Sequence, residues 1–314
     1  MKLSFITTVL NEEGNIEKLL KSLSSQTVLP DEVIIVDGGS SDRTIAEIKY
    51  QISNIKNDVK FKILIKKGNR SIGRNEAIKN ARGDIILSSD AGCVLDKNWV
   101  KNIIKPFENK KNDVVSGYYK GTGETVFEKS LIPYVLVMEN RLSPENFLPA
   151  TRSMAFKKEI WKKAGRFDEK LSHNEDFEFA KRLKKVGANI KFAKDAIVYW
   201  RPRKNIKEAF IMFYRFAFGD AEAGIIRPKV IFLFARYSVG ILFVFIYLYT
   251  NSLFLLILIF TLLGNYILWA MFKNYRYINN KRALIYLPLL QFTADFSVLL
   301  GTTIGFLKSF FIKK

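Results

Sequence analysis

The sequence predicts an α/β fold, with a mostly parallel sheet and flanking helices, followed by α-helical membrane segments. Short β-rich runs alternate with longer amphipathic runs up to about residue 204, which is typical of βαβ units. Three later segments are apolar and long enough to span a bilayer, at residues 230–249, 253–272 and 283–307.

The elements of the first part of the chain follow from the spacing of its apolar residues. The helix at residues 15–25 places Ile16, Leu19, Leu20 and Leu23 on one face, and Pro30 separates it from the next strand. The same reasoning predicts strands at residues 3–9, 33–36, 60–65 and 84–88, and further helices at residues 42–54 and 72–81.

Acidic side chains follow two of these strands. Asp37 comes directly after the second strand and leads into glycines and serines, and Asp90 follows the fourth strand in a similar turn. Ligands of α/β sheets bind outside the carboxyl ends of the strands, where Gly and Ser allow close approach of the backbone. Either acid alone is equally explained as the cap of a turn or helix. Two of them together indicate a nucleotide site.

The composition limits the metal chemistry and the class of partner. The chain has one cysteine, Cys93, and one histidine, His173, so an internal disulfide and a Cys/His metal cluster are excluded and any metal needs oxygen ligands. The formal charge is +20, and residues 230–314 contribute 8 of the 50 basic residues but 1 of the 30 acids. Because the basic excess flanks apolar segments, we expect a membrane and no nucleic acid as partner.

The expected domain organisation follows the same change in composition. The first strand pattern begins at residue 3 with no long apolar signal segment before it, so we expect a cytosolic domain. Residues 205–229 carry aromatic side chains among charges, which suits a helix at a membrane surface or one packed on the first domain. The expected parts are a domain at residues 1–204, an interfacial or linker helix at 205–229 and a membrane domain at 230–314.

A series of short motifs occurs in a characteristic order along the first domain. They are TVLNEE at residues 8–13, SSQT at 24–27, VDGGSSDRT at 36–44, RNEAI at 74–78, ARGDII at 81–86, DAG at 90–92, AFKKE at 155–159, GRFDE at 165–169 and NEDFEFAKRL at 174–183. Their order and spacing resemble the inverting glycosyltransferases of family 2. The resemblance implies the GT-A fold, a Rossmann-like fold of nucleotide-diphospho-sugar transferases.

The resemblance also implies a donor site. Asn11, Glu12 and Asp37 correspond to positions that contact the nucleotide, and Asp90 begins the family's Asp-x-Asp motif, which binds the donor and a magnesium or manganese ion. Here the third position of that motif is Gly92, and Gly38 stands where the family often has a second Asp.

Basic residues beside this donor site have two readings. Arg74, with Arg70, is expected either to face the donor pyrophosphate or to form a solvated basic face. Trp200, Arg201 and Arg203, which follow the last predicted strand, are expected to close over donor or acceptor.

The catalytic base is expected in the last of these motifs. Inverting transfer needs a group that accepts the proton of the acceptor hydroxyl, and Asp176 matches the second acid of the family's Glu-Asp motif. Glu175 is the second candidate. The alternative is that these acids only complement the dipole of the helix that begins there. His173 is expected in a partly exposed loop, and Asp168 in a turn.

The apolar segments raise a question of topology. The basic loop at residues 273–282 is expected to be cytoplasmic, so the first two segments form a hairpin that turns at residues 250–252. A crossing by the third segment would place Lys308, Lys313 and Lys314 outside, against the positive-inside tendency, whereas a re-entrant segment would not. The third segment contains Pro288 and Asp295, so it is expected to be broken or buried, with Arg236 either reaching the interface or paired with Asp295.

Two functions of different classes fit these observations. The first is a multi-pass enzyme of the cell membrane with a cytoplasmic catalytic domain. It would move a sugar, with inversion, from a nucleotide-diphospho-sugar to a lipid carrier or lipid-linked glycan in cell-envelope polysaccharide or glycolipid synthesis. The second is a nucleotide-sensing membrane scaffold or transporter without transferase activity. The acidic sites cluster in the first domain, which favours the enzyme, a hexosyltransferase-like glycosyltransferase dependent on Mg²⁺ or Mn²⁺.

Overall fold

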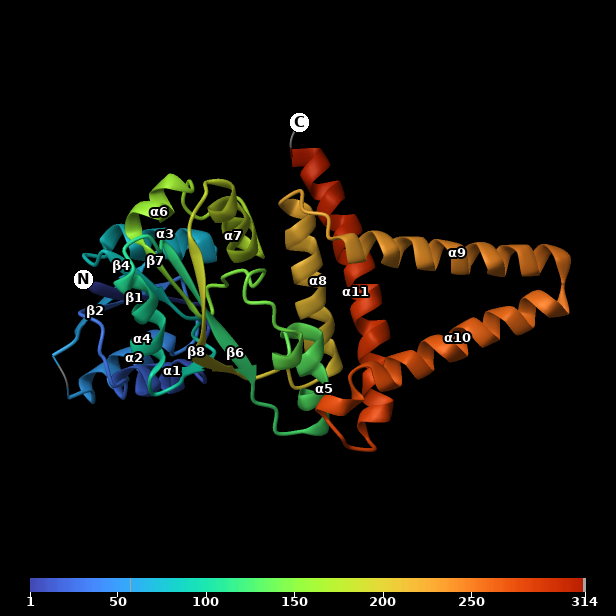
Figure 1. Ribbon diagram of the computed structural model, residues 1–314, viewed down its shortest axis with the longest axis horizontal. Helices are drawn as coiled ribbons and strands as arrows, with labels where there is room; N and C mark the ends of the chain where they lie inside the picture. Colours follow the sequence, from blue (N-terminus) through green and yellow to red (C-terminus); the bar gives the residue numbers. More distant parts are fainter. Residues whose placement is uncertain (57, 313–314) are drawn as a thin grey trace. The chain divides into compact units, whose positions relative to one another are not determined.

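The computed structural model describes residues 1–56 and 58–312, the side chain of Ile312 excepted. Lys313 and Lys314, which enter the topology argument, lie outside the described residues. The chain divides into two compact units (Figure 1). Unit 1 contains Met1–Gly121 and Val137–Arg201, and unit 2 contains Thr122–Leu136 and Pro202–Lys314.

Unit 1 is built on one mixed sheet of eight strands. Their order across the sheet is β3-β2-β1-β4-β7-β6-β8-β5. The strands are β1 (Leu3–Val9), β2 (Glu32–Asp37), β3 (Lys60–Ile65), β4 (Ile85–Ser88), β5 (Cys93–Leu95), β6 (Val114–Gly121), β7 (Met154–Lys157) and β8 (Ile190–Trp200).

The direction of the strands determines which side chains share an edge of the sheet. Four of the seven pairings that the structure describes are parallel, so the predicted mostly parallel sheet is confirmed. β7 runs antiparallel to both β4 and β6. The carboxyl ends of β2, β4, β6 and β8 and the start of β7 therefore lie at one edge.

Helices cover both faces of this sheet. Figure 1 shows α3, α6 and α7 on one face and α1, α2 and α4 on the other. Ile6 of β1 packs in the core with Trp161 and Phe179, whereas the neighbouring Phe5 contacts the ring of Trp99 on the other face. The helices are α1 (Ile16–Ser24), α2 (Thr44–Ser53), α3 (Arg70–Asn80), α4 (Trp99–Ile104), α6 (Lys158–Lys163) and α7 (Glu175–Lys185), with 3-10 turns η1 (Lys105–Glu108) and η2 (Glu139–Arg141).

The predicted strands and helices of residues 3–88 are all present, with ends that differ by at most two residues. One alternative was wrong. Asp90 does not cap a helix, because the short strand β5 follows it and the next helix begins at Trp99. Asp37 is the last residue of β2, so its side chain stands at the end of the strand as expected.

Unit 2 consists of helices. They are α5 (Val126–Val135), α8 (Ile206–Glu222), α9 (Pro228–Thr250), α10 (Leu253–Lys273) and α11 (Ala283–Ile312), with the turn η3 (Tyr275–Tyr277). Among the described residues, three helical spans have the length and apolar composition needed to cross a membrane: Pro228–Thr250, Leu253–Tyr277 and Ala283–Phe311.

The third apolar segment differs from expectation in one respect. Pro288 does not break α11, because a proline near the start of a long helix removes one backbone hydrogen bond without ending the helix. Of the two alternatives for Arg236, the structure shows the pair with Asp295, since Arg236 Nη2 donates to Asp295 Oδ2 at 2.8 Å. Asp295 itself is buried between the helices.

Helices α8 and α11 pack very closely. A Cβ atom at Gly301 would lie 2.5 Å from the carbonyl oxygen of Tyr214, and one at Gly305 would lie 2.7 Å from that of Phe218. Small residues four apart allow such contact between helix backbones, as in membrane helix pairs. The sequence did not predict this partner for the helix in 205–229.

Candidate active site

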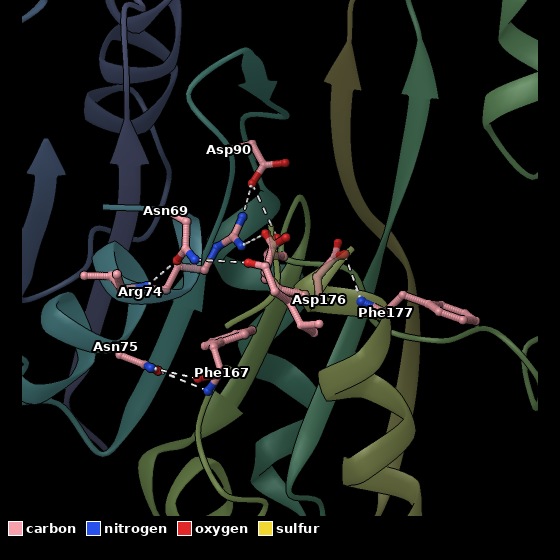
Figure 2. Close-up of polar contacts among 11 residues, drawn as sticks. Asn69, Arg74, Asn75, Asp90, Phe167, Asp176 and Phe177 are labelled. Atoms are coloured by element: carbon pink, nitrogen blue, oxygen red, sulfur yellow. Dashed lines mark hydrogen bonds and ion pairs between the residues drawn. The ribbon is translucent and has the colours of Figure 1, made fainter. Parts of the chain in front are cut away.

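A buried arginine joins the acids that the sequence predicts at the edge of the sheet. Arg74, on α3, is 3% exposed. Its Nη1 donates a short hydrogen bond to Glu175 Oε1 at the start of α7, and its Nη2 donates to Asp90 Oδ1 at 3.0 Å after β4 (Figure 2). Three segments far apart in the sequence therefore meet at one guanidinium group.

Local hydrogen bonds fix the position of α3. Asn69 caps the helix by accepting from Ile72 N–H at 3.0 Å, and its side chain donates to the carbonyl of Glu169 at 2.7 Å. Asn75 both donates to the carbonyl of Phe167, at 2.9 Å, and accepts from its N–H, at 3.0 Å (Figure 2). Both asparagines hold the segment that leads into α7 against α3, so Arg74 and Glu175 face each other.

The burial of Arg74 bears on the two predictions made for it, a contact with the donor pyrophosphate or a place on a solvated basic face. A solvated basic face is wrong for this residue, although it fits Arg70, which is exposed. Burial lowers the pKa of the Arg74 guanidinium, but the charges of Glu175 and Asp90 raise it by more than burial lowers it. The net pKa shift is therefore upward, and the group stays charged. Its contact with the donor pyrophosphate stays a prediction.

Asp176 lies in the first turn of α7, as the second residue of the helix. Its carboxylate accepts a hydrogen bond from the N–H of Phe177 at 2.8 Å (Figure 2). A helix N-terminus alone would lower the pKa of an acid there. The pKa of Asp176 is instead raised, by burial and then by the charge of Glu175, against the opposing charge of Arg74. The helix dipole alone therefore does not account for the direction of this shift. The role of Asp176 as proton acceptor stays a prediction.

Asp90 carries the opposite shift. Burial raises its pKa, but Arg74, Arg152 and Arg70 lower it more, so the net pKa is lowered and Asp90 stays ionised. The Asp90 side chain is 40% exposed. Arg74 and, at 3.5 Å, Thr151 donate to its Oδ1.

The surroundings of Asp90 provide few further metal ligands. Within residues 1–56 and 58–312, no group of three His, Cys, Asp or Glu side chains could hold a metal ion. A Cβ atom at Gly92 would meet no atom within 4 Å, so the missing acid of the Asp-x-Asp pattern leaves open space. A single carboxylate fits Mg²⁺ or Mn²⁺ only if donor phosphates and water supply the other oxygens.

The turn after β2 is ordered by Asp37. The buried carboxylate accepts from the N–H groups of Gly39 and Ser40, both at 3.0 Å, and from the Ser40 hydroxyl. Ser40 in turn accepts from the N–H of Asn11 at 2.9 Å, and the Asn11 side chain accepts from Ser41 N–H at 2.9 Å.

The neighbouring loop is tied to the same region. Glu12 N–H donates to Thr44 Oγ1 at 2.8 Å, at the start of α2. The structure thus brings Asn11, Glu12 and Asp37 together, with much of the Asp37 carboxylate used inside its own turn. Direct contact of these residues with a nucleotide stays a prediction.

Arg152 is a site residue that the sequence reasoning missed. Its Cζ lies 5.1 Å from the centre of the Trp200 ring and 5.2 Å from that of Tyr119, so two aromatic rings hold the guanidinium. Ser89 Oγ donates to the Arg152 carbonyl at 2.9 Å, which ties this segment to the turn of Asp90. The buried Nε of Arg152 has no hydrogen-bond acceptor among the described residues. The sequence did contain one indication of this role. Arg152 is a basic residue just before β7, and β7 begins at the edge of the sheet that carries Asp90.

The remaining candidates occupy ordinary positions. His173 lies in a loop, half-buried, with Nδ1 3.0 Å from Ser172 Oγ, and Asp168 accepts from Lys170 N–H in a turn, both as expected. Burial raises the pKa of the Cys93 thiol to about 12, so it is no nucleophile. Trp200 is buried beneath Arg152, whereas Arg203 is exposed.

The fold and the sequence both match known glycosyltransferases. The model of the family described as "Glycosyl transferase family 2" matches residues 4–164, and that of "Glycosyl transferase family group 2" matches residues 113–296. A solved structure, a mannosyltransferase from Pyrobaculum calidifontis in complex with GDP-Man and Mn²⁺, is 17% identical with a TM-score of 0.66, covering 93% of this chain and 86% of its own. This likeness confirms the GT-A fold. The chain belongs to glycosyl transferase family 2, a family of enzymes.

Two relatives illustrate the range of similar proteins. Glycosyltransferase AglE of Haloferax volcanii is 28% identical over 199 residues, which is 62% of this chain and 65% of AglE. A Methanococcus voltae protein is 25% identical over 276 residues, which is 83% of this chain and 85% of that protein. Its name is dolichyl N-acetyl-alpha-D-glucosaminyl phosphate 3-beta-D-2,3-diacetamido-2,3-dideoxy-beta-D-glucuronosyltransferase. The chain thus spans slightly less than two thirds of AglE.

Proposed function

We propose that this protein is a membrane-bound glycosyltransferase with a cytoplasmic catalytic domain. It moves a sugar, with inversion, from a nucleotide-diphospho-sugar to a lipid carrier or lipid-linked glycan, as in cell-envelope polysaccharide or glycolipid synthesis. The observation that carries the proposal is the cluster around Arg74, in which one acid is kept ionised and another has a raised pKa.

The similar proteins support both substrates. The mannosyltransferase neighbour was solved with a nucleotide-diphospho-sugar, GDP-Man, and the Methanococcus voltae relative is named for transfer to a dolichyl-linked sugar phosphate. The apolar helices of unit 2 provide an anchor that would keep the catalytic unit near such an acceptor.

Asp176 is proposed as the base. As the acceptor oxygen attacks the anomeric carbon, its proton passes to the Asp176 carboxylate, the bond between the anomeric carbon and the diphosphate oxygen breaks, and the nucleoside diphosphate leaves. The raised pKa of Asp176 makes it a stronger proton acceptor than an ordinary aspartate. Glu175 keeps Arg74 in place, so it positions the site rather than accepting the proton.

The leaving diphosphate needs positive charge nearby. The Arg152 guanidinium lies against the rings of Trp200 and Tyr119, and its buried Nε has no hydrogen-bond acceptor in the part of the chain that the structure describes, so we assign it to the diphosphate. Asp90 would hold a divalent cation together with donor phosphates and water, and such an ion stabilises negative charge on the leaving group. Asn11, Glu12 and Asp37 are assigned to the nucleotide.

Donor binding is the direct test of this function. Titration calorimetry of the 314-residue chain with UDP and GDP, in Mn²⁺ or Mg²⁺, is expected to show one binding site. The Arg152→Gln variant should bind at least about tenfold more weakly, because a charge-assisted hydrogen bond to phosphate is lost. A thermal-shift panel of nucleotide sugars then identifies the donor.

The matched control is Arg82→Gln, since Arg82 is exposed just before β4, at the opposite edge of the sheet. It should bind like the wild type. If no nucleoside diphosphate binds with either cation, the transferase proposal fails. If Arg152→Gln binds like Arg82→Gln, Arg152 is not a diphosphate ligand.

Restoring the missing acid tests the role assigned to Asp90. The Gly92→Asp side chain would enter open space beside a carboxylate, so it is expected to lower the Mn²⁺ concentration for half-maximal activity, on the order of tenfold. In chelator the same variant should bind nucleotide more weakly than the wild type, because it adds negative charge. Gly92→Ala separates the charge from the added Cβ, and an unchanged Mn²⁺ requirement in Gly92→Asp would show that position 92 does not face the cation.

A further inference from the structure

The two ends of α11 lie beside the two ends of the α9–α10 hairpin. Lys308, near the end of α11, donates to Glu222 at 2.7 Å, and Glu222 ends the helix just before α9 begins. Arg227 pairs with Asp220 across the intervening turn. The start of α11 follows the end of α10 through the short η3 segment. If the hairpin crosses a bilayer, both of its base ends lie on one side, and so do both ends of α11.

We propose that only α9 and α10 cross the bilayer, and that α11 lies in the plane of the membrane with α8, with its apolar face in the lipid. Both ends of α11 then lie on the same side of the membrane as the catalytic unit. This inference rests on the membrane attachment in the proposed function. It does not depend on the reaction. Three helices are long and apolar enough to cross a membrane, but in this arrangement only two of them do.

The lengths of the helices agree with this arrangement. The 23 residues of α9 and 21 of α10 rise about 34 and 31 Å, which matches the roughly 30 Å hydrocarbon core. The 30 residues of α11 rise about 45 Å, half as much again as the core. Figure 1 shows α9 and α10 running away from α11 rather than alongside it.

The helices packed on α11 cannot accompany it across a bilayer. The backbone of α8 lies in close contact with the second half of α11 at Gly301 and Gly305, so a crossing by α11 would take α8 with it unless this contact opened. Lys207 and Arg215 of α8 are exposed, and Arg215 lies near the middle of that helix. A crossing by α11 would carry both charges into hydrocarbon, which is unfavourable.

The first half of α11 is packed in the same way. The Tyr134 hydroxyl of α5 donates to the Leu287 carbonyl at 2.8 Å, and the Phe127 and Tyr286 rings are in edge contact. Lys129 on α5 is exposed. Helices that carry exposed charges therefore cover α11 on one side along much of its length.

The opposite side of α11 is a continuous apolar face. Its exposed large apolar residues recur at helical spacing: Ile285, Leu289, Phe296, Leu300, Ile304, Leu307, Phe310 and Phe311. Of the charged residues in α11, Asp295 is buried and Lys308, near the end of the helix, is exposed. A helix with one packed side and one exposed apolar side suits the boundary between headgroups and acyl chains. We therefore assign lipid as the partner that covers this apolar face. Lys308 and the other basic residues of this part of the chain favour a membrane with an anionic surface.

A polar cluster joins the hairpin to α11. Asp295 accepts from Arg236 at 2.8 Å, from the Tyr237 hydroxyl at 3.0 Å and from Gln291 at 3.0 Å, and also from the Tyr266 hydroxyl. With α11 in the membrane plane, this cluster lies near the headgroups. A spanning α11 would place it deep in hydrocarbon.

Depth measurements by spin labelling test the proposal. The 314-residue chain, in vesicles of phosphatidylethanolamine and phosphatidylglycerol, carries a single label at Ile285→Cys, Phe296→Cys or Leu307→Cys in a Cys93→Ala background. These three exposed positions of α11 should report equal depths, because all lie in one plane. In a spanning helix the outer two would be separated by about 33 Å along the axis, with Phe296 the deepest of the three.

The hairpin supplies the matched control. Labels at Phe232→Cys, Ile241→Cys and Leu248→Cys, all exposed on α9, should give unequal depths with Ile241 the deepest. A Cys added after Lys314 should react with an impermeant maleimide from the same side as Lys18→Cys, and Asn251→Cys from the opposite side. A graded depth along α11, or a chain end on the side of Asn251, overturns the proposal. Neither readout requires donor binding or transfer.

Discussion

Asp176→Asn is expected to lower the rate of sugar transfer by about 10² to 10⁴, the usual contribution of a general base, while nucleotide binding stays close to that of the wild type. Asn has the size of Asp but cannot accept the proton of the acceptor hydroxyl. Single-turnover transfer assays, with calorimetry of nucleotide binding, measure the two effects separately. In the wild type, transfer should rise with pH through the raised pKa of Asp176 and then level off.

The same variant should be at least as stable as the wild type at neutral pH. The folded-state pKa of Asp176 is raised above its ordinary value, so ionisation of this side chain costs stability. The penalty is absent below the ordinary pKa and complete above the raised one. Asp176→Asn removes the penalty, and thermal unfolding at pH 7.5 should show a midpoint equal to or above that of the wild type.

Glu178→Gln is the control, because Glu178 lies in the same turn of α7 but pairs with Arg182 at 2.6 Å. It should transfer sugar normally. If Asp176→Asn also transfers at the normal rate, Asp176 is not the base. The acceptor would then be a group that is already ionised, such as the phosphate of a lipid carrier, which needs no proton acceptor.

Arg74→Met is expected to destabilise the protein strongly as well as to abolish transfer. Glu175, whose side chain is 4% exposed, would lose its ion-pair partner, and an uncompensated buried charge costs about 3–5 kcal/mol. For a domain of this size that corresponds to a drop of roughly 6–20 °C in the unfolding midpoint. Thermal unfolding of the full chain measures it.

The double variant Arg74→Met/Glu175→Gln separates stability from catalysis. It removes both charges of the buried pair, so most of the lost stability should return, whereas transfer should not. Lys21→Met, which breaks the exposed pair of Lys21 with Glu17, should change stability by less than about 1 kcal/mol. An Arg74→Met variant as stable as Lys21→Met would show that Arg74 does not support the buried acids.

The sequence predicted those parts of the structure that depend on local pattern. The strands and helices of residues 3–88 follow from apolar spacing, and Asp37 and Asp90 share an edge because parallel strands end on the same side of a sheet. The Arg236–Asp295 pair was also accessible, since each charge has few alternatives inside an apolar segment. These features need no knowledge of distant packing.

Features that depend on contacts between distant segments were not predictable. The sequence alone could not show that Arg74 is buried against Glu175, 101 residues away, rather than solvated. Arg152 belongs to no motif, and only the antiparallel placement of β7 beside β4 brings it near Asp90. The close packing of α8 on α11 rests on two glycines whose role appears only with their partners.

The chain leaves unit 1 after Gly121, forms α5 and returns at Val137, before it leaves again after Arg201. No single cut therefore yields the catalytic unit as a separate piece. A fragment that ends near residue 204 would retain α5 without α11, and Phe127 would lose its partner Tyr286. Such a fragment would expose the apolar side chains of α5 that now pack on α11, so the two units depend on each other through the course of the chain as well as through their contacts within each unit.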